Sequence, residues 1–432
     1  MSSVTSFASL CDPSQFGYSS LFGAKFSSLQ AKLVTNFALD VSLGPGQPNL
    51  TYSEENTNFC NVTVTYTHPG YEDAVSVETW LPVDNYNGRL QAIGGSGWVS
   101  GRHPVTYWKM ASVAGDGYAT VTTDAGVEQN LANPDPWALE SPGNLNLVAL
   151  SNFGHVALHD EAVIAKDLIK QLYGKPPAYS YFNGYAYDGI MAAAPAMNWS
   201  PFLNQLTALA VSTCEELNLA KGGVITEPEA CLITFNPKKH VGEWFQCSDT
   251  ESKMEISEAA ANVALATWHG PTFANGRFLW YGFDIGSDLS SIGQESIATW
   301  VRDFIQKDPT SNVTSLTRSG FDTFYRSLKF SFGTMLETGE VDLSDFRRKG
   351  GKLITFHGLE VLDFSNGSTA NFYQYYRVPG LQHCSGGASS PPLELFSQLR
   401  QWVENGTTPN TLHFTQWSLR VDSQAWVHDI SV

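Results

Sequence analysis

Strand-like segments that end in glycine-rich turns alternate with helical segments through the first half of this sequence, and this alternation constrains the fold most. Residues 74–82 and 89–93 alternate or run apolar, which is typical of strands. The second run leads directly into Gly94-Gly95-Ser96-Gly97, a glycine-rich loop. Because strands that alternate with helices form a mainly parallel sheet covered on both faces, the sequence predicts an α/β fold.

The same pattern continues and then breaks, which predicts how the chain is divided. After a polar N-terminal stretch and the segments above, periodicity predicts helices at 105–113 and 155–173 and strands at 118–123 and 179–183. Strands at 352–357 and 372–378 and a helix at 393–403 follow much later. We therefore predict an N-terminal α/β part at 1–197, a lid insertion at 198–349 that includes a helix at 256–268, and a C-terminal α/β part at 350–432.

Charge narrows the class of partner. Across 432 residues, 25 Lys plus Arg face 42 Asp plus Glu, a net charge of -17 that repels phosphate backbones and anionic lipid. No apolar run approaches the roughly 18 residues of a membrane-spanning helix. We expect a small-molecule substrate and neither nucleic acid nor a membrane as partner. The sequence carries no signal for an oligomeric state.

Six cysteines and six Asn-X-Ser/Thr sequons, the first at Asn49 and the last at Asn405, indicate a secreted ancestry. The first residues lack the basic and apolar regions of an export signal. We therefore expect no signal peptide within this chain, and an intracellular location stays open.

An ordered series of short motifs resembles the tannase and feruloyl esterase family. They include Gly94-Gly95-Ser96-Gly97-Trp98, Thr122-Thr123-Asp124-Ala125-Gly126 and Val378-Pro379-Gly380-Leu381-Gln382-His383-Cys384. The remaining matches lie at residues 81–82, 86–90, 173–177, 180–184, 188–190, 194–199 and 357–358. The resemblance implies an α/β-hydrolase-like fold, with a mainly parallel sheet and a lid. It also implies the activity of the family, which is hydrolysis of carboxylic esters, here of phenolic or polyketide-like esters.

The resemblance also implies a catalytic apparatus. The family uses a serine in a Cys-Ser pair after the Phe-Asn-Gly strand, an aspartate after the later His-Gly, and a histidine in a His-Cys pair. A disulfide joins the two cysteines of these pairs. Such enzymes open an ester by serine attack, with histidine as base and backbone N–H groups stabilising the oxyanion.

The serine has no counterpart here. After Phe182-Asn183-Gly184 the sequence goes directly to Tyr185-Ala186-Tyr187, so the family's elbow and following helix are missing. Read without a gap, Ala186 takes the serine position, and alanine cannot attack a carbonyl. Removing a triad serine costs roughly a millionfold in rate, about 8 kcal/mol. Only a few residues separate the predicted strand at 179–183 from the next apolar run, which starts at Gly189. A crossover between two parallel strands of one sheet usually needs a dozen or so residues. We therefore expect the strand that starts at Gly189 to be displaced, or the local sheet to be rearranged.

Other family positions have changed as well. Val361 stands near the expected acid, where Glu360 or Asp363 substitutes for it, unless both are solvated loop carboxylates. In the stretch that resembles the family's calcium loop, Asn218 and Lys221 replace expected carboxylates, so we predict no metal, and no cofactor either.

The cysteines follow the family only in part. The resemblance implies disulfides between Cys11 and Cys60 and between Cys214 and Cys231. Cys384 lacks its family partner, and Cys247 lacks a nearby mate. We expect both to be small buried hydrophobic residues rather than reactive thiols.

Some groups still have usable chemistry. His383 keeps its motif and is either an acid or base near neutral pH or a remnant that is hydrogen-bonded within its loop. Gly95, Ser96 and Gly97 offer backbone N–H groups to an oxyanion or substrate. His357 is a further pocket candidate at a strand end, whereas His159-Asp160 is expected to serve packing or helix-surface hydrogen bonds.

Three hypotheses follow. The first is a repurposed non-hydrolytic catalyst that uses His383, with Glu360 or Asp363, on a phenolic or polyketide-like molecule. The second is a catalytically inactive binding module, and the third is a true esterase read with a missing exon. Because Val361, Lys221 and Cys247 lie far apart in the sequence, one skipped exon does not explain every change, which favours a relaxed or redirected function over the third hypothesis.

Overall fold

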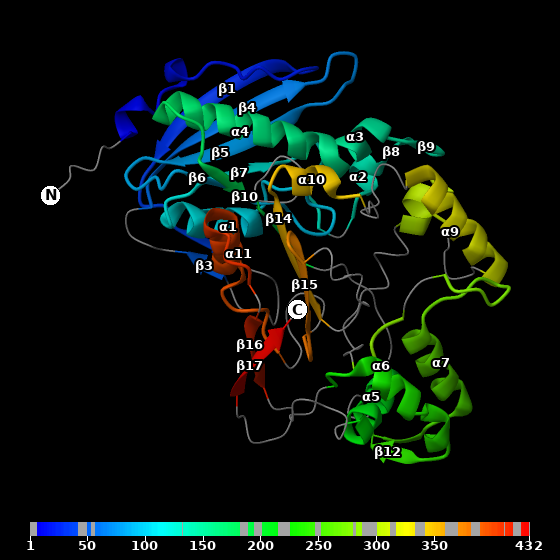
Figure 1. The fold of residues 1–432 in the computed structure, drawn as a ribbon. Helices are drawn as coiled ribbons and strands as arrows, with labels where there is room; N and C mark the ends of the chain where they lie inside the picture. Colours follow the sequence, from blue (N-terminus) through cyan, green and yellow to red (C-terminus); the bar gives the residue numbers. More distant parts are fainter. Residues whose placement is uncertain are drawn as a thin grey trace. The chain divides into compact units, whose positions relative to one another are not determined.

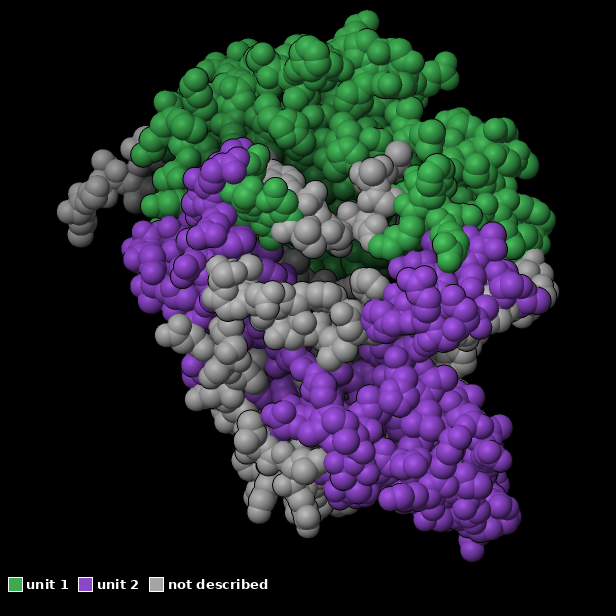
Figure 2. Space-filling model, turned by 45° about the vertical axis from the view of Figure 1, so that its right-hand side comes forward, with its two compact units in different colours: residues 1–190, 299–314, 326–346 green, residues 191–298, 315–325, 347–432 purple. Residues whose placement is uncertain are grey.

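The computed structural model describes residues 7–41, 50–52, 57–131, 133–181, 189–193, 201–214, 225–246, 252–279, 282–286, 300–311, 317–332, 342–358, 370–381, 389–409, 411–417 and 425–431. The chain forms two compact units, which Figure 2 distinguishes by colour. Unit 1 holds residues 1–190, 299–314 and 326–346, and unit 2 holds residues 191–298, 315–325 and 347–432. The predicted lid at 198–349 contributes residues to both units, and the three-part division stays a prediction.

Unit 1 is built on a mixed sheet. Its strands lie in the order β1 (Lys25–Val34), β4 (Phe59–Thr67), β5 (Val75–Pro82), β7 (Ala119–Thr123), β6 (Arg89–Ala92) and β10 (Tyr179–Tyr181). The β1–β4, β4–β5 and β5–β7 pairs are antiparallel, whereas β7–β6 and β6–β10 are parallel. The predicted strands at 74–82, 89–93, 118–123 and 179–183 are confirmed.

The antiparallel edge corrects the expectation of a merely polar N-terminal stretch. β4 alternates fully buried residues such as Val62 and Val64 with half-buried Asn61 and Thr63. β1 pairs along its whole length with β4 but buries no residue completely. A strand with one face to solvent alternates polar and apolar side chains, which gives it a polar composition.

Helices cover both faces of this sheet. On one face, the β4 and β5 side chains Val62 and Val77 share a core with Ile164 and Leu168 of α4 (Ala157–Tyr173). On the other face, Phe59 and Trp80 stack at 4.2 Å between ring centroids and pack with Met110 of α1 (Pro104–Gly115). Figure 1 shows α4 lying along β4 and β5. Both predicted helices are therefore confirmed, as is the covering of two faces.

Short elements complete unit 1. Two short 3-10 helices, η1 (Ala8–Leu10) and η2 (Pro13–Gln15), lie before the first strand. There are also two small antiparallel strand pairs. One consists of β2 (Leu39–Val41) and β3 (Leu50–Tyr52), and the other of β8 (Leu139–Ser141) and β9 (Asn144–Leu145). Helices α2 (Asp135–Ala138) and α3 (Leu147–Ser151) precede a π-helical turn, η3 (Asn152–Val156), that runs into α4. A second π-helical turn is η6 (Trp300–Gln306).

Unit 2 contains a helical cluster and a parallel strand pair. The helical cluster consists of α5 (Pro201–Cys214), α6 (Pro228–Thr234) and α7 (Glu258–His269). These helices pack around Leu206, Cys231 and Trp268. Between α6 and α7, the turn η5 (Pro237–His240) leads to an antiparallel pair of strands, β12 (Trp244–Gln246) and β13 (Lys253–Glu255). β14 (Lys352–Gly358) and β15 (Tyr373–Val378) are parallel, followed by α11 (Leu395–Asn405) and the antiparallel pair β16 (Thr411–Trp417) and β17 (Ala425–Ser431). The predicted strands at 352–357 and 372–378 and helices at 256–268 and 393–403 are confirmed.

Two helices include residues of both units, α9 (Arg318–Phe332) and α10 (Ser344–Arg348). The disulfides Cys11–Cys60 and Cys214–Cys231 are both present, as the resemblance implied. Within the described ranges, none of the helices is long and apolar enough to cross a membrane.

Candidate functional site

The glycine-rich loop at residues 94–101 connects β6 to the start of α1 and folds back on itself. The amide of Gly95 donates to the carbonyl of Ser100 at 2.6 Å, and Val99 donates to Ser96 at 3.1 Å. Trp98, 7% exposed, anchors the loop in the core and donates its amide to Leu131 at 3.2 Å. A Cβ at Gly95 would lie 1.9 Å from the Val99 carbonyl oxygen, so only glycine fits there.

These contacts distinguish among the three predicted amide donors. Gly95 already donates to Ser100, whereas the amides of Ser96 and Gly97 bond to no other residue in the described ranges. All three residues are exposed, and Gly97 takes a left-handed φ of +58°. The loop therefore presents two adjacent N–H groups to solvent, which is the kind of arrangement that binds an oxygen anion.

Arg102, the residue after this loop, is held by the buried carboxylate of Glu78 and the half-buried carboxylate of Asp124. Its Nε donates to Glu78 at 3.1 Å and its NH1 donates to Asp124 at 2.9 Å. The Arg102 amide also donates to the hydroxyl of Thr122, and its backbone takes a left-handed φ of +46°. Burial lowers the pKa of the Arg102 guanidinium, but the charges of Glu78, Tyr107 and Asp124 and the hydrogen bond to Asp124 together outweigh this and raise the pKa above its usual value.

Glu78 is the centre of this arrangement. The side chain lies on β5, is 5% exposed, and its Oε2 accepts from Arg102 and from the hydroxyl of Tyr107 at 2.9 Å. Its Oε1 accepts from Asn61 at 2.8 Å and from the indole of Trp80 at 2.9 Å. Four donors therefore satisfy one buried carboxylate, as burial of a charge requires.

Asp124 connects the same arginine to the end of β7. Its Oδ1 accepts from the amides of Ser76 at 2.8 Å and Gly126 at 2.9 Å, while Oδ2 accepts from Arg102. The Thr-Thr-Asp-Ala-Gly motif thereby fixes the C-terminal end of the glycine-rich loop. We define Glu78, Arg102, Tyr107 and Asp124 as the Arg102 cluster. Sequence reasoning missed this cluster, and the only signal available was that Asp124 lies in a family motif.

The short link between β10 and β11 (Gly189–Ala193) agrees with the expectation of a displaced second strand. β10 and β11 are parallel neighbours, but they pair only at Tyr181 and Gly189. Because the last residue of one strand meets the first residue of the next, the chain does not have to return along a whole strand. A link of seven residues is therefore long enough where a full crossover is not.

The remaining predicted site residues fall in two groups. His383, Glu360, Asp363 and the positions around Ala186 lie outside the described residues, as do Val361, Asn218, Lys221, Cys247 and Cys384. His357 is described: it lies on β14, in register with Arg377 of β15, and is 5% exposed.

His159-Asp160 serves packing, as expected. Asp160 is 5% exposed and accepts from the hydroxyl of Tyr66 at 2.8 Å, whereas His159 is exposed. His68 lies between two aspartates, with Nδ1 2.6 Å from Asp73 and Nε2 3.3 Å from Asp160. Among the residues described, no group of three His, Cys, Asp or Glu side chains is arranged to hold a metal ion.

Solved structures define the class of fold. The chain matches tannin acyl hydrolase from Aspergillus niger with a TM-score of 0.80 and 22% identity, covering 99% of this chain and 92% of that one. Feruloyl esterase B from Aspergillus oryzae matches with a TM-score of 0.74 and 20% identity, covering 99% and 95% of the two chains. The protein therefore has an α/β-hydrolase fold with a mostly parallel central sheet.

Sequence comparison identifies the family. The family described as tannase and feruloyl esterase matches residues 60–202 and 360–425. A probable feruloyl esterase of Arthroderma benhamiae is 28% identical over 442 residues, covering 86% of this chain and 80% of that protein. The tannase of Aspergillus oryzae is 23% identical over 505 residues, covering 90% and 84%. This chain is similar to the tannase and feruloyl esterase family in sequence and in fold, and its two disulfides are compatible with secretion.

Proposed function

We propose that this protein acts on a phenolic or polyketide-like small molecule by proton transfer at His383, without forming an acyl-enzyme. The observation that carries the proposal is the link from β10 to β11. Its seven residues, Phe182-Asn183-Gly184-Tyr185-Ala186-Tyr187-Asp188, contain no serine, threonine or cysteine. A covalent ester hydrolase of this family needs its nucleophile just after this strand.

The surviving groups suit a different reaction. An imidazole that titrates near neutral pH takes a proton from an activated C–H or O–H group and returns it elsewhere, with no covalent intermediate. The Ser96 and Gly97 amides are available to bind the oxygen anion that forms when the proton leaves. Glu360 or Asp363 is proposed to orient the imidazole of His383.

Hydrolysis is tested first, with a chromogenic ferulate ester and a serine-directed fluorophosphonate. We expect no turnover above buffer and no covalent labelling, because loss of a triad serine lowers the rate roughly a millionfold. A fungal tannase serves as the positive control for both reagents. Rapid hydrolysis together with labelling would defeat the proposal.

Proton transfer is tested by NMR, through exchange of the acidic C–H of a phenolic 1,3-diketone in D2O. Wild-type protein is expected to accelerate exchange and His383→Ala to abolish the acceleration, while the thermal midpoint of unfolding stays the same. His159→Ala, which changes an exposed histidine, is the matched control and retains activity. Equal exchange in wild type and His383→Ala excludes His383 and leaves a binding module.

Transcript sequencing across the codons of Gly184 and Tyr185 addresses the missing-exon hypothesis separately. A contiguous transcript supports the proposal. A transcript that carries an additional segment with a Cys-Ser pair would make the protein an ordinary esterase instead.

A further inference from the structure

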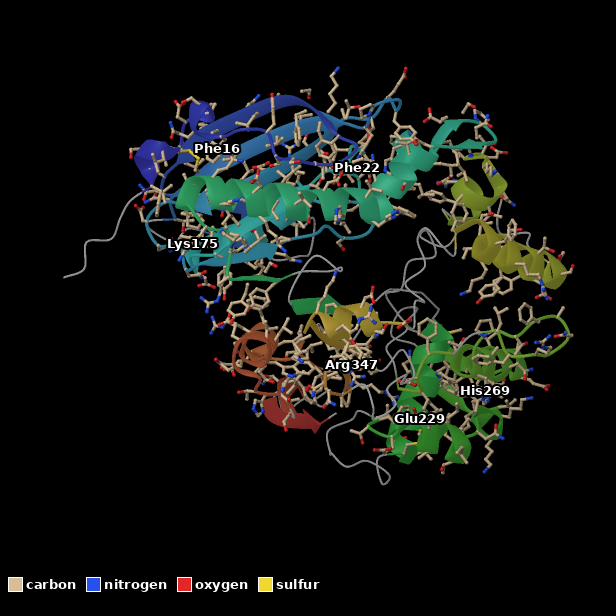
Figure 3. All side chains as sticks on the ribbon, turned by 45° about the horizontal axis from the view of Figure 1, so that its top comes forward. Phe16, Phe22, Lys175, Glu229, His269 and Arg347 are labelled. Carbon is tan, nitrogen blue, oxygen red and sulfur yellow. A yellow bond between two sulfur atoms is a disulfide. The ribbon has the colours of Figure 1, made fainter. Side chains whose placement is uncertain are left out.

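A cavity of about 260 Å³ lies within unit 2, between α6, the end of α7, Phe278 and residues 282–285. It is smaller than the roughly 300–1,000 Å³ of sites for drug-sized ligands, so it suits a small molecule. Its lining includes the aromatic rings of Trp268, Phe278 and Phe283 and the carboxyl groups of Glu229 and Asp284. Figure 3 labels Glu229 and His269, which come from α6 and α7.

The walls of this cavity are held firmly. The amide of Phe283 donates to the carbonyl of Thr267 at 3.0 Å, which fastens the segment to the last turn of α7. A Cβ at Gly282 would lie 2.2 Å from the Trp268 carbonyl oxygen, so glycine permits this close approach. The backbone of Gly282 and Phe283 therefore lies against the last turn of α7, which carries Trp268.

The charge of the cavity is negative. Arg377 donates to Glu229 at 2.9 Å and to Asp284 at 2.8 Å, so one guanidinium faces two carboxylates. Burial raises the pKa of Asp284 to about 6, while the charge of Arg377 acts in the opposite direction. Asp284 is therefore mostly ionised at pH 7.5. Two carboxyl groups face one guanidinium, which gives the three groups an excess of one formal negative charge.

We propose that this cavity binds a small alkylated ammonium ion. Three aromatic rings and excess negative charge form the kind of environment that recognises quaternary ammonium groups. The two carboxylates, Glu229 and Asp284, exceed the one guanidinium of Arg377 and balance the cation. This inference does not depend on the proposed function, since it concerns neither His383 nor ester chemistry.

Choline and its uncharged isostere 3,3-dimethylbutan-1-ol separate charge from shape. Isothermal titration of the full chain at pH 7.5 in 150 mM NaCl is expected to show saturable choline binding, with the neutral alcohol at least tenfold weaker. The salt screens the general attraction of a cation to an acidic protein. Equal binding of choline and the alcohol, or no binding of choline, would overturn the proposal.

Two variants test the walls. Phe278→Leu changes a ring that is 58% exposed and is expected to weaken choline binding about threefold through loss of a cation–π contact. Glu229→Gln is expected to weaken it further than Phe278→Leu. Phe330→Leu, at an exposed ring elsewhere, is the control and leaves binding unchanged. Wild-type affinity in both wall variants contradicts the assignment even if choline binds.

The ammonium group has two natural sources, a free metabolite and a lipid headgroup. Flotation with phosphatidylcholine vesicles distinguishes them. Protein that floats with the vesicles and is released by free choline assigns the group to a headgroup. Binding of choline without flotation assigns it to a free metabolite, and each of these outcomes supports the cation site.

Discussion

Replacing Arg102 by alanine removes the only cation that the described structure places between Glu78 and Asp124. The side chains of these carboxylates are 7% and 18% exposed, so neither is well solvated after the change. Two hydrogen bonds to charged groups are lost together with the charge itself. We therefore expect Arg102→Ala to destabilise unit 1 strongly.

The magnitude follows from the burial of the cluster. Removing one partner of a buried ion pair costs about 3–5 kcal/mol, because the remaining charge stays buried without compensation. Arg102 itself is 26% exposed at its side chain, which admits some water and places the cost near the lower end, about 3 kcal/mol. In a unit of roughly 150–250 residues this lowers the thermal midpoint by about 6–12 °C.

Thermal unfolding followed by near-ultraviolet circular dichroism measures the shift. Arg102→Lys keeps the positive charge but cannot contact both carboxylates as the guanidinium does, so its midpoint is expected to lie between those of wild type and Arg102→Ala. Lys32→Ala, on the exposed side of β1, is the control and should change the midpoint by less than about 2 °C. A midpoint for Arg102→Ala within 2 °C of wild type would refute the argument that the cluster holds the loop.

Two further predictions concern single positions. Gly95→Ala is expected to lower the free energy of unfolding by about 1–3 kcal/mol, because the new methyl group overlaps the Val99 carbonyl. Gly17→Ala, which has open space around its Cβ position, is the control and is expected to leave the free energy of unfolding unchanged. Urea denaturation of both variants measures the two values. Burial raises the pKa of Asp284 from 3.8 to about 6, so the folded protein binds this proton more tightly than the unfolded chain. The stability due to this group is complete below pH 3.8 and is lost as the pH rises to 6, by an amount on the order of 3 kcal/mol. The difference between wild type and Asp284→Asn in urea denaturation should shrink or reverse across that window, and a constant difference would contradict the assignment.

Periodic elements were the easiest part of the fold to predict. The apolar face of α4 repeats Ile164, Leu168 and Leu172 at helical spacing, and each is buried as that spacing requires. β1 was missed because its pairing with β4 leaves one face in solvent, and its sequence then looks like a polar loop. The local sequence of a strand does not show which distant strand it pairs with at the edge of a sheet.

The candidate site was less predictable because it depends on contacts between distant segments. The glycine-rich loop was recognised from its composition, but the commitment of the Gly95 amide to Ser100 depends on how the loop closes. Glu78, Arg102 and Asp124 come from three separate segments, and only the folded sheet brings them together. A buried carboxylate such as Glu78 is not distinguishable by sequence from an exposed one.

The seven-residue passage from β10 to β11 also bears on how reversible the history of this protein is. An enzyme silenced by one substituted serine regains activity by one back mutation, so selection for hydrolysis can restore it. Under the function proposed above, a single codon change would supply a hydroxyl but not the stretch of chain that the family resemblance implies is missing. On that proposal, a return to ester cleavage would need an insertion that also preserves the Tyr181–Gly189 pairing.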